Sequence, residues 1–262
     1  MKNIFAYLIL FIFLSIINQA EASTIEQSVK TIDNVNISYN IYNNNHKEVV
    51  ILAHGWFMTK DSKAFTQIAK DFSKYYDVIV LDFRGHGKSK GKYSFGTNEV
   101  NDLKPIIDLA HQKYKKIYLI GFSLGSLISV DYCSKYGNVD KLILVSAPVS
   151  FEKIENNVFS PHAFVPTFRK FELDRWTSIR FDKIFDKKVK PIQEISKITI
   201  PILFIAGKKD PIIHNWHNEE LYKQSKSKNK KIFMLENGRH AEDIYLEAPK
   251  TFMKICLNFL KS

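Results

Sequence analysis

The sequence predicts an α/β protein in which a mostly parallel central sheet is flanked by helices. Short, continuous apolar runs alternate along the chain with longer stretches in which apolar residues recur every three or four positions. Continuous apolar runs are typical of strands buried on both faces, and the helical stretches between them supply the cover. A third observation is a serine between two glycines, Gly121-Phe122-Ser123-Leu124-Gly125, directly after one of these runs.

Each predicted strand follows from the pattern of its own segment. Residues 35–42 alternate apolar and polar side chains, which indicates an early, half-exposed strand. The continuous apolar runs predict further strands at 48–53, 77–81, 116–120, 141–145, 200–205 and 231–235. Helical spacing of apolar residues predicts helices over 62–75, 99–114, 124–136, 214–225 and 243–260. No internal repeat or low-complexity linker breaks this order, so we expect one domain at 23–262.

The first 22 residues have the pattern of a signal peptide. An almost uninterrupted apolar run covers residues 4–17, and Ala20-Glu21-Ala22 follows it. At ~1.5 Å per residue, a helix of this length is too short to cross ~30 Å of hydrocarbon. Small residues flanking one position suit a signal peptidase, with cleavage after Ala22. We therefore expect an exported protein, periplasmic or secreted, and the alternative is an uncleaved N-terminal membrane anchor.

Charge and cysteine content narrow the classes of partner. The 262 residues carry a net charge of +11, which favours anionic surfaces. The lysines are scattered, however, and form no stripe interleaved with aromatic residues, so we expect no nucleic-acid partner. Peripheral contact with a membrane or lipid is compatible with this charge. Cys133 and Cys256 fit neither a disulfide framework nor a zinc pattern, and their spacing leaves open whether they pair.

One interval is much longer than an ordinary connection. About fifty residues, roughly 149–198, separate two predicted strands, and we expect this segment to be a short helical cap inserted into the domain. The aromatic residues of the interval could line an acyl-chain or aromatic-acid pocket, or could pack the cap onto the sheet. They are Phe159, Phe164, Phe168, Phe171, Trp176, Phe181 and Phe185.

Ser123 is the predicted nucleophile. A serine at a sharp turn between a strand and a helix needs a strained backbone, and Gly121 and Gly125 leave room for the chain to pass. The alternative is a glycine-rich turn that contains a serine by chance. The apolar run before the motif and the helical stretch after it favour the catalytic interpretation.

A serine hydroxyl needs a base and the base needs an acid. His240 follows the last predicted strand, and Asp210 follows the strand before it, so both side chains emerge at the same edge of the sheet. Glu242 and Asp243 are alternative acids, but their positions suit the first turn of the last helix. His214 and His217 stand three residues apart without a third metal ligand, and we expect both to face solvent. We expect no metal and no cofactor.

Acyl transfer also needs two N–H donors for the negative charge that forms on the substrate oxygen. The backbone of Leu124 is one candidate, because it opens a helix whose first N–H groups have no partner within the helix. The second donor is expected in the loop after the strand at 48–53, which reads His54-Gly55-Trp56-Phe57. We predict Trp56, with Phe57 as the alternative.

These motifs together resemble the α/β-hydrolase superfamily, and within it the monoacylglycerol lipase/serine aminopeptidase-like branch. The resemblance rests on His54-Gly55, on the run from Asp82 to Ser89 (DFRGHGKS), on the Ser123 motif, and on Asp210 with His240. It covers nearly all of residues 35–260. It implies a catalytic triad of serine, acid and histidine, with an oxyanion donor directly after His-Gly. His54 and His86 match structural loop positions of such proteins.

The sequence therefore predicts an exported serine hydrolase that cleaves carboxylic esters through an acyl-enzyme. The substrate would be a small ester, and a lipid or lysophospholipid ester would suit a basic exported protein with an aromatic cap. Two alternatives are a peptidase or amidase of the same fold, because the same triad cleaves amides, and a non-catalytic binding protein on a hydrolase scaffold.

Overall fold

The structure is a computed structural model that describes residues 23–156, 160–161, 172–182, 184 and 186–262. The predicted signal peptide at 1–22 lies outside these ranges. So do five of the seven aromatic residues of the predicted cap, namely Phe159, Phe164, Phe168, Phe171 and Phe185.

The described chain forms an eight-stranded sheet with the order β1-β2-β4-β3-β5-β6-β7-β8. The first two strands run antiparallel to their neighbours, and all later pairs are parallel. This arrangement confirms the predicted fold class. The strands are β1 Ser23–Lys30, β2 Asn36–Asn43, β3 Glu48–Ala53, β4 Asp77–Leu81, β5 Lys116–Phe122, β6 Lys141–Val145, β7 Ile202–Gly207 and β8 Lys230–Leu235.

Strand β1 is the one strand that the sequence analysis missed. It pairs with β2 along all eight of its residues, but it is an edge strand and its side chains are almost all exposed. Its sequence, STIEQSVK, therefore carries no apolar face of period two. Backbone pairing to β2, rather than burial of side chains, holds this strand in place.

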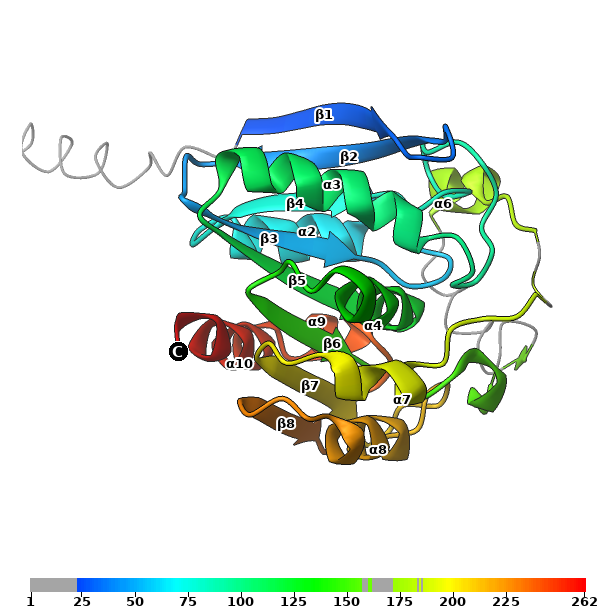
Figure 1. Cartoon of the computed structure of the whole chain (residues 1–262), viewed down its shortest axis with the longest axis vertical. Coiled ribbons are helices and arrows are strands. Elements are labelled where there is room, and N and C mark those ends of the chain that lie inside the picture. The colour runs from blue at the N-terminus through cyan, green and yellow to red at the C-terminus, as the bar shows by residue number, and fades with distance from the viewer. Residues whose placement is uncertain (1–22, 157–159, 162–171, 183, 185) are drawn as a thin grey trace, which may run out of the picture.

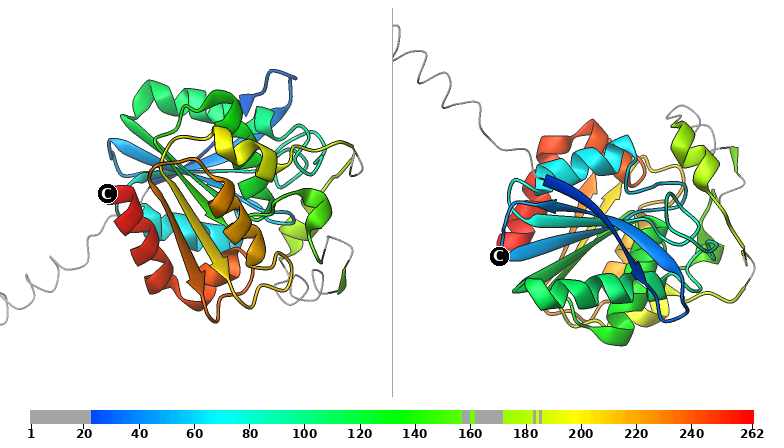
Figure 2. Two further views of the ribbon diagram at one scale, coloured as in Figure 1. Left: turned by 60° about the horizontal axis from the view of Figure 1, so that its bottom comes forward. Right: turned by 90° about the horizontal axis from the view of Figure 1, so that it is seen from above.

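Helices cover both faces of the sheet (Figures 1 and 2). One face carries α3 Val100–Lys113, α4 Leu124–Tyr136, α7 Pro191–Glu194 and α8 Trp216–Gln224. The opposite face carries α2 Lys63–Phe72, α9 Glu242–Glu247 and α10 Pro249–Lys261. Two separate clusters of fully buried side chains, one on each face, form the core.

The predicted single helix at 243–260 was wrong, because the chain forms two helices there. Ala248 separates α9 from α10 with a non-helical backbone, φ −142° and ψ 61°, and Pro249 occupies the first turn of α10. Proline lacks an N–H group and disfavours helical geometry in the residue before it. The break therefore lies where proline places it, although the apolar spacing continues on both sides.

The two cysteines lie on opposite faces of the sheet. Cys133 of α4 belongs to one buried cluster and Cys256 of α10 to the other, and both are free thiols. Burial raises the pKa of each thiol far above its usual range. The question that the sequence left open is thereby answered: these cysteines do not pair.

The interval 149–198 begins with a short turn of 3-10 helix, η1 Phe151–Lys153, and contains α6 Leu173–Ser178. Figure 1 shows α6 beside the carboxyl ends of the parallel strands. An isolated bridge between Tyr93 and Phe181 ties the segment after α6 to the loop that follows β4. The interval ends with α7 and η2 Ile195–Lys197, which contact α4 on the body of the domain.

The order of the strands creates one natural place for a site. Strand β3 lies between β4 and β5, so the connections from β3 and β5 leave the sheet in opposite directions. Ligands of open α/β sheets bind at such a switch point, outside the carboxyl ends of the strands. No helix in the described ranges is long and apolar enough to span a membrane.

Candidate active site

Ser123 lies at a strained turn between β5 and α4. Its backbone has φ 54° and ψ −120°, a conformation that non-glycine residues rarely adopt. A Cβ atom on Gly121 would approach the Gly125 carbonyl oxygen to 2.7 Å, and one on Gly125 would approach the Ala53 carbonyl oxygen to 2.2 Å. Both glycines are therefore required for close passage of the chain, as the sequence predicted.

The turn brings three side chains from distant segments into one hydrogen-bonded chain. His240 Nε2 lies 2.9 Å from Ser123 Oγ, and His240 Nδ1 lies 2.8 Å from Asp210 Oδ2. With a proton on Nδ1, the imidazole donates to the carboxylate and accepts from the serine hydroxyl. Asp210 and Ser123 are buried and the His240 side chain is 14% exposed. Of the three hydrogen-bonded side chains, the imidazole is therefore the one that solvent reaches most easily.

The two charged partners shift each other's pKa. Burial by itself lowers the pKa of His240, but the Asp210 carboxylate and its hydrogen bond outweigh burial and raise it above the usual value. Burial by itself raises the pKa of Asp210, and the positive charge and hydrogen bond of His240 reverse that shift, so the net change is downward. Asp210 is thus ionised at neutral pH, and it stabilises the imidazolium form of His240.

Backbone donors fix the Asp210 carboxylate. The N–H groups of Ile212 and Ile213 both donate to Asp210 Oδ1 at 2.9 Å. Glu242 and Asp243, the alternative acids, occupy the first turn of α9, whereas the carboxylate against the His240 ring is that of Asp210. The structure therefore brings the predicted serine, histidine and aspartate together.

Leu124 and the loop that contains Trp56 both lie next to Ser123. Leu124 follows it directly as the first residue of α4, where N–H groups have no acceptor within the helix. Gly55, the residue before Trp56, packs so closely that a Cβ there would lie 3.0 Å from Ser123 Cβ. The alternative donor Phe57 already donates its N–H to His86 Nε2 at 3.4 Å. Trp56 and Leu124 thus remain the predicted pair.

The expectation that His214 and His217 both face solvent was wrong for His217. His214 is half exposed, but His217 is fully buried. Its Nδ1 accepts from the Val149 N–H at 3.1 Å, and its Nε2 lies 3.0 Å from Glu155 Oε2. Position on the helix could not reveal this, because the covering residues come from the distant segment after β6. No cluster of three metal-ligating side chains occurs among the residues that the structure describes.

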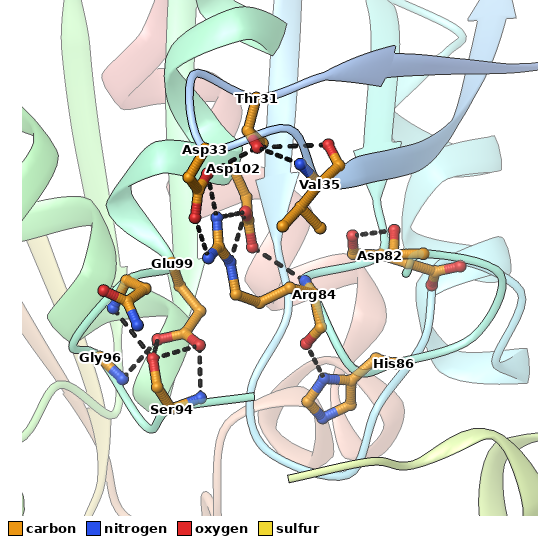
Figure 3. Close-up of polar contacts among 12 residues, drawn as sticks. Thr31, Asp33, Val35, Asp82, Arg84, His86, Ser94, Gly96, Glu99 and Asp102 are labelled. Atoms are coloured by element: carbon orange, nitrogen blue, oxygen red, sulfur yellow. Dashed lines mark hydrogen bonds and ion pairs between the residues drawn. The ribbon is translucent and has the colours of Figure 1, made fainter. Parts of the chain in front are cut away.

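An ionic cluster around the buried Arg84 supports the loop after β4, and sequence reasoning missed it. Figure 3 shows the Arg84 guanidinium between two carboxylates. Its Nε lies 2.8 Å from Asp102 Oδ1, and its two terminal nitrogens contact both oxygens of Asp33 at 2.6 and 3.0 Å. The Arg84 N–H also donates to Asp102 at 2.8 Å. Arg84 thus joins the turn between β1 and β2, helix α3 and the loop after β4.

A second buried carboxylate orders the next part of the same loop. Glu99 is fully buried and accepts from the N–H groups of Ser94 and Gly96 at 2.6 and 2.7 Å (Figure 3). In the same segment, Tyr93 stacks on Trp56 with ring centroids 5.5 Å apart, and Phe95 packs on Trp56 at 4.6 Å. The loop therefore forms the wall behind the predicted oxyanion donor. The DFRGHGKS run marks the loop, but its ionic partners lie too far along the chain to be recognised.

Ser146 is a further residue next to the site that the sequence did not single out. It is fully buried at the end of β6 and has a positive φ of 48°. Its hydroxyl accepts from the N–H of Ala241 at 3.0 Å, and Ala241, also at positive φ, directly follows His240. The strand next to the Ser123 turn thus holds the backbone that carries the imidazole.

Comparisons with known proteins match this chain to two protein families. Residues 48–172 match the family described as alpha/beta hydrolase fold, and residues 175–243 match serine aminopeptidase, S33. The uncharacterized protein YqkD of Bacillus subtilis is 26% identical over 235 residues, covering 85% of this chain and 74% of that protein. The human serine hydrolase BPHL is 21% identical, covering 81% of this chain and 79% of its own.

A solved structure shares the fold along most of the chain. The Pyrococcus furiosus esterase Pf2001 superposes with a TM-score of 0.74 at 24% identity, covering 92% of each chain. For several other curated relatives, the aligned part of this chain covers 54% to 62% of the relative's own length.

The fold, the strained serine and the matched families define the class of this protein: the chain belongs to the α/β-hydrolase superfamily. Within the superfamily it fits the monoacylglycerol lipase/serine aminopeptidase-like branch, because the serine aminopeptidase match covers the segment from α6 through His240. These similarities support a hydrolase of the α/β-hydrolase fold.

Proposed function

We propose that this protein is a serine hydrolase that cleaves carboxylic esters through an acyl-enzyme formed on Ser123. The observation that carries the proposal is the hydrogen-bonded chain from Ser123 through His240 to Asp210, with distances of 2.9 and 2.8 Å. The strained backbone of the serine and the helix that begins at Leu124 add support, since they expose the hydroxyl beside backbone donors.

In the first half of the proposed reaction, Ser123 Oγ attacks the ester carbonyl carbon while His240 Nε2 takes the hydroxyl proton. The carbonyl oxygen becomes an oxyanion that accepts from the N–H groups of Trp56 and Leu124. The carbon–oxygen bond to the alcohol then breaks, and the imidazolium returns the proton to the leaving oxygen. Asp210 holds the Nδ1–H tautomer and stabilises the imidazolium throughout.

In the second half, water replaces the alcohol. His240 Nε2 removes a proton from the water, and the resulting hydroxide adds to the acyl carbon with the same two N–H donors on the oxyanion. The intermediate collapses, the bond to Ser123 Oγ breaks, and the proton passes from His240 to the serine. The products are a carboxylic acid and an alcohol, and every atom is supplied by the ester and one water molecule.

For the substrate, we propose an ester with an apolar acyl or aromatic group, such as a lipid or lysophospholipid ester. The described cap residues support this, because Trp176 of α6 packs edge-on against Phe57 at 4.5 Å and Phe181 lies 5.9 Å from Trp56. Aromatic rings from the cap thus adjoin the loop of residues 54–57, which carries the predicted donor Trp56. We also propose export directed by residues 1–22, peripheral contact with lipid and no nucleic-acid partner, which the sequence pattern and scattered lysines support.

A peptidase or amidase activity is the second candidate, and one observation favours it. The segment that carries Asp210 and His240 matches serine aminopeptidase, S33. An amide needs stronger help for its leaving group than an ester does, since the amine must be protonated by His240 as it departs. The same residues would carry both reactions, so substrate panels must separate them.

The test begins with a fluorophosphonate probe, which labels an activated serine, applied to the wild-type protein and to Ser123→Ala. We expect labelling of the wild type alone, followed by hydrolysis of p-nitrophenyl esters that changes with acyl length. A parallel panel of aminoacyl-anilides would reveal the amidase. An unlabelled wild type would instead indicate a binding protein on a hydrolase scaffold, and equal labelling of Ser123→Ala would remove the assigned nucleophile.

A further inference from the structure

Two buried histidines contact the backbone of the loop that carries the predicted oxyanion donor Trp56. His54 and His86 are both fully buried, and their ring centroids lie 5.0 Å apart. His54 directly follows β3, while His86 belongs to the loop after β4. Their hydrogen bonds are made to the backbone, so each ring can fix the direction of a peptide unit.

His54 holds the peptide between Gly55 and Trp56. Its Nε2 accepts from the Phe83 N–H at 3.1 Å, so the proton of the neutral ring is on Nδ1. That Nδ1–H donates to the Gly55 carbonyl oxygen at 2.7 Å. The Gly55 carbonyl and the Trp56 N–H belong to one planar trans peptide, in which they point in opposite directions. Fixing the carbonyl therefore fixes the direction of the Trp56 N–H.

His86 holds the next peptide, between Trp56 and Phe57. Its Nε2 accepts from the Phe57 N–H at 3.4 Å, and its Nδ1 lies 3.3 Å from the Arg84 carbonyl oxygen. The same tautomer, with the proton on Nδ1, satisfies both contacts. Phe57 has a positive φ of 68°, a conformation that a bulky residue keeps only when its surroundings enforce it.

The His86 imidazole is itself held by Arg84, the central residue of the cluster in Figure 3. The Arg84 carbonyl that accepts from His86 belongs to the residue that is clamped by Asp102 and Asp33. The Tyr93 ring packs at right angles on His86 with centroids 4.5 Å apart. Burial lowers the pKa of His54 to about 4 and lowers the pKa of His86 well below its usual value. Both rings are therefore neutral at pH 7, as their acceptor roles require.

We propose that His54 and His86 are positioning residues that clamp the two peptide units on either side of Trp56 and thereby aim the Trp56 N–H at the oxyanion. The inference rests on the proposed function, since it concerns the same reaction. It assigns the two rings complementary tasks. His54 acts as a donor through Nδ1, and His86 acts as an acceptor through Nε2.

Paired amide substitutions can separate these tasks from simple packing. An asparagine amide nitrogen stands at the position of Nδ1, whereas a glutamine amide oxygen reaches the position of Nε2. His54→Asn and His86→Gln should therefore keep kcat within about threefold of wild type. The exchanged pair, His54→Gln and His86→Asn, should lose about 10- to 100-fold in kcat with KM nearly unchanged, because a misplaced oxyanion donor weakens only the transition state.

A transition-state analogue gives a second readout on the same variants. A phenylboronic acid adds to the active serine and forms a tetrahedral anion in the oxyanion site. Its inhibition constant should rise in His54→Gln and His86→Asn by the factor by which kcat falls. In His54→Asn and His86→Gln, the rescuing variants, the inhibition constant should stay near the wild-type value. The exposed His111→Asn serves as the histidine-to-amide control. An equal fall in kcat in all four variants, or a change in KM without a fall in kcat, would overturn the proposal.

The tautomers can be measured even where a variant fails to fold. In ¹⁵N-edited spectra of the wild type, both imidazoles should carry the proton on Nδ1 at pH 7, with signals assigned through the rescuing variants. A proton on Nε2 of either ring would overturn the proposal. A wild type that the fluorophosphonate does not label contradicts the proposed function, whereas a labelled wild type with unaffected variants contradicts this inference alone.

Discussion

Histidines of opposite character meet at one edge of this sheet. On the side of β7 and β8, His240 contacts the Asp210 carboxylate, and its pKa is raised. On the side of β3 and β4, His54 and His86 contact backbone groups, and their pKa values are lowered. The partner decides the difference, since a carboxylate favours the charged ring whereas burial against neutral peptides disfavours it. His240 can therefore exchange a proton at neutral pH, whereas His54 and His86 stay neutral and fix the backbone groups that they contact.

The largest effect should follow from removing the ring that exchanges the proton. His240→Ala should lower kcat for an ester substrate by about 10⁴- to 10⁶-fold, because a serine without its base is a weak nucleophile. Steady-state hydrolysis of a p-nitrophenyl ester measures the loss. Circular dichroism should show an unchanged fold. Activity of His240→Ala within tenfold of wild type would show that the two sides do not divide the work in this way.

Removing the carboxylate should make His240 resemble the neutral pair. In the wild type, activity requires the neutral base, so kcat/KM should fall as pH drops through a pKa above 6.5. Asp210→Asn should lower kcat by about 10⁴-fold, and its pH midpoint should move to lower pH, because the largest influence that raises the His240 pKa is then removed and only Glu242 and Asp243 oppose burial. The pH profile of kcat/KM measures both changes. A midpoint that rises or stays fixed would mean that Asp210 does not set this pKa.

The two sides also differ in how far the sequence predicts them. Ser123, Asp210 and His240 each follow a predicted strand, and parallel strands bring such positions to one edge. Their meeting could therefore be expected from order along the chain. The contact of Arg84 with Asp33 depends instead on β1, an exposed edge strand without a periodic signal. Sequence pattern indicates burial and local spacing, but it does not indicate which charged side chains will pair across 51 residues.

The surroundings of the histidines show the same limit of what the sequence pattern can predict. The family resemblance implied that His54 and His86 were structural, but only the folded structure shows which ring nitrogen contacts which peptide group. For His217, helical position suggested solvent, and the segment around Val149 and Glu155 covers it. A side chain's surroundings come from several distant segments at once, so a linear pattern cannot specify them.

Removing the Arg84 guanidinium, which supports the oxyanion side of the site at β3 and β4, should destabilise the fold. Arg84→Met leaves the fully buried Asp102 without its guanidinium, and we expect a loss of about 3–5 kcal/mol in the free energy of unfolding. Urea denaturation measures it. Burial already raises the pKa of Asp102 to about 7, so the loss should be larger at pH 8 than at pH 6, where the carboxyl can accept a proton.

A matched pair on the surface provides the control for this prediction. Lys104 and Asp108 form an exposed ion pair one helical turn apart, and Lys104→Met should change stability by less than about 0.5 kcal/mol. The double variant Arg84→Met/Asp102→Asn should recover part of the loss, because it removes the isolated charge. Equal effects of the buried and exposed substitutions would mean that the cluster of Figure 3 does not support the oxyanion side.

The smallest effect, and the sharpest contrast in sign, is the pH dependence of stability. His54 has a folded pKa of about 4 against about 6.5 when unfolded, so its contribution is fully present above pH 6.5 and is lost as pH falls toward 4. Wild type should lose about 2–3 kcal/mol relative to His54→Asn between pH 7.5 and 4.5, as measured by urea denaturation.

His240 behaves oppositely, since its raised pKa stabilises the fold below pH 6.5 and that contribution is lost as pH rises through the folded pKa. The difference between wild type and His240→Ala should therefore shrink toward alkaline pH, whereas the difference between wild type and His54→Asn should grow in favour of the wild type. If both differences changed in the same direction with pH, the two sides of the site would not hold histidines of opposite character.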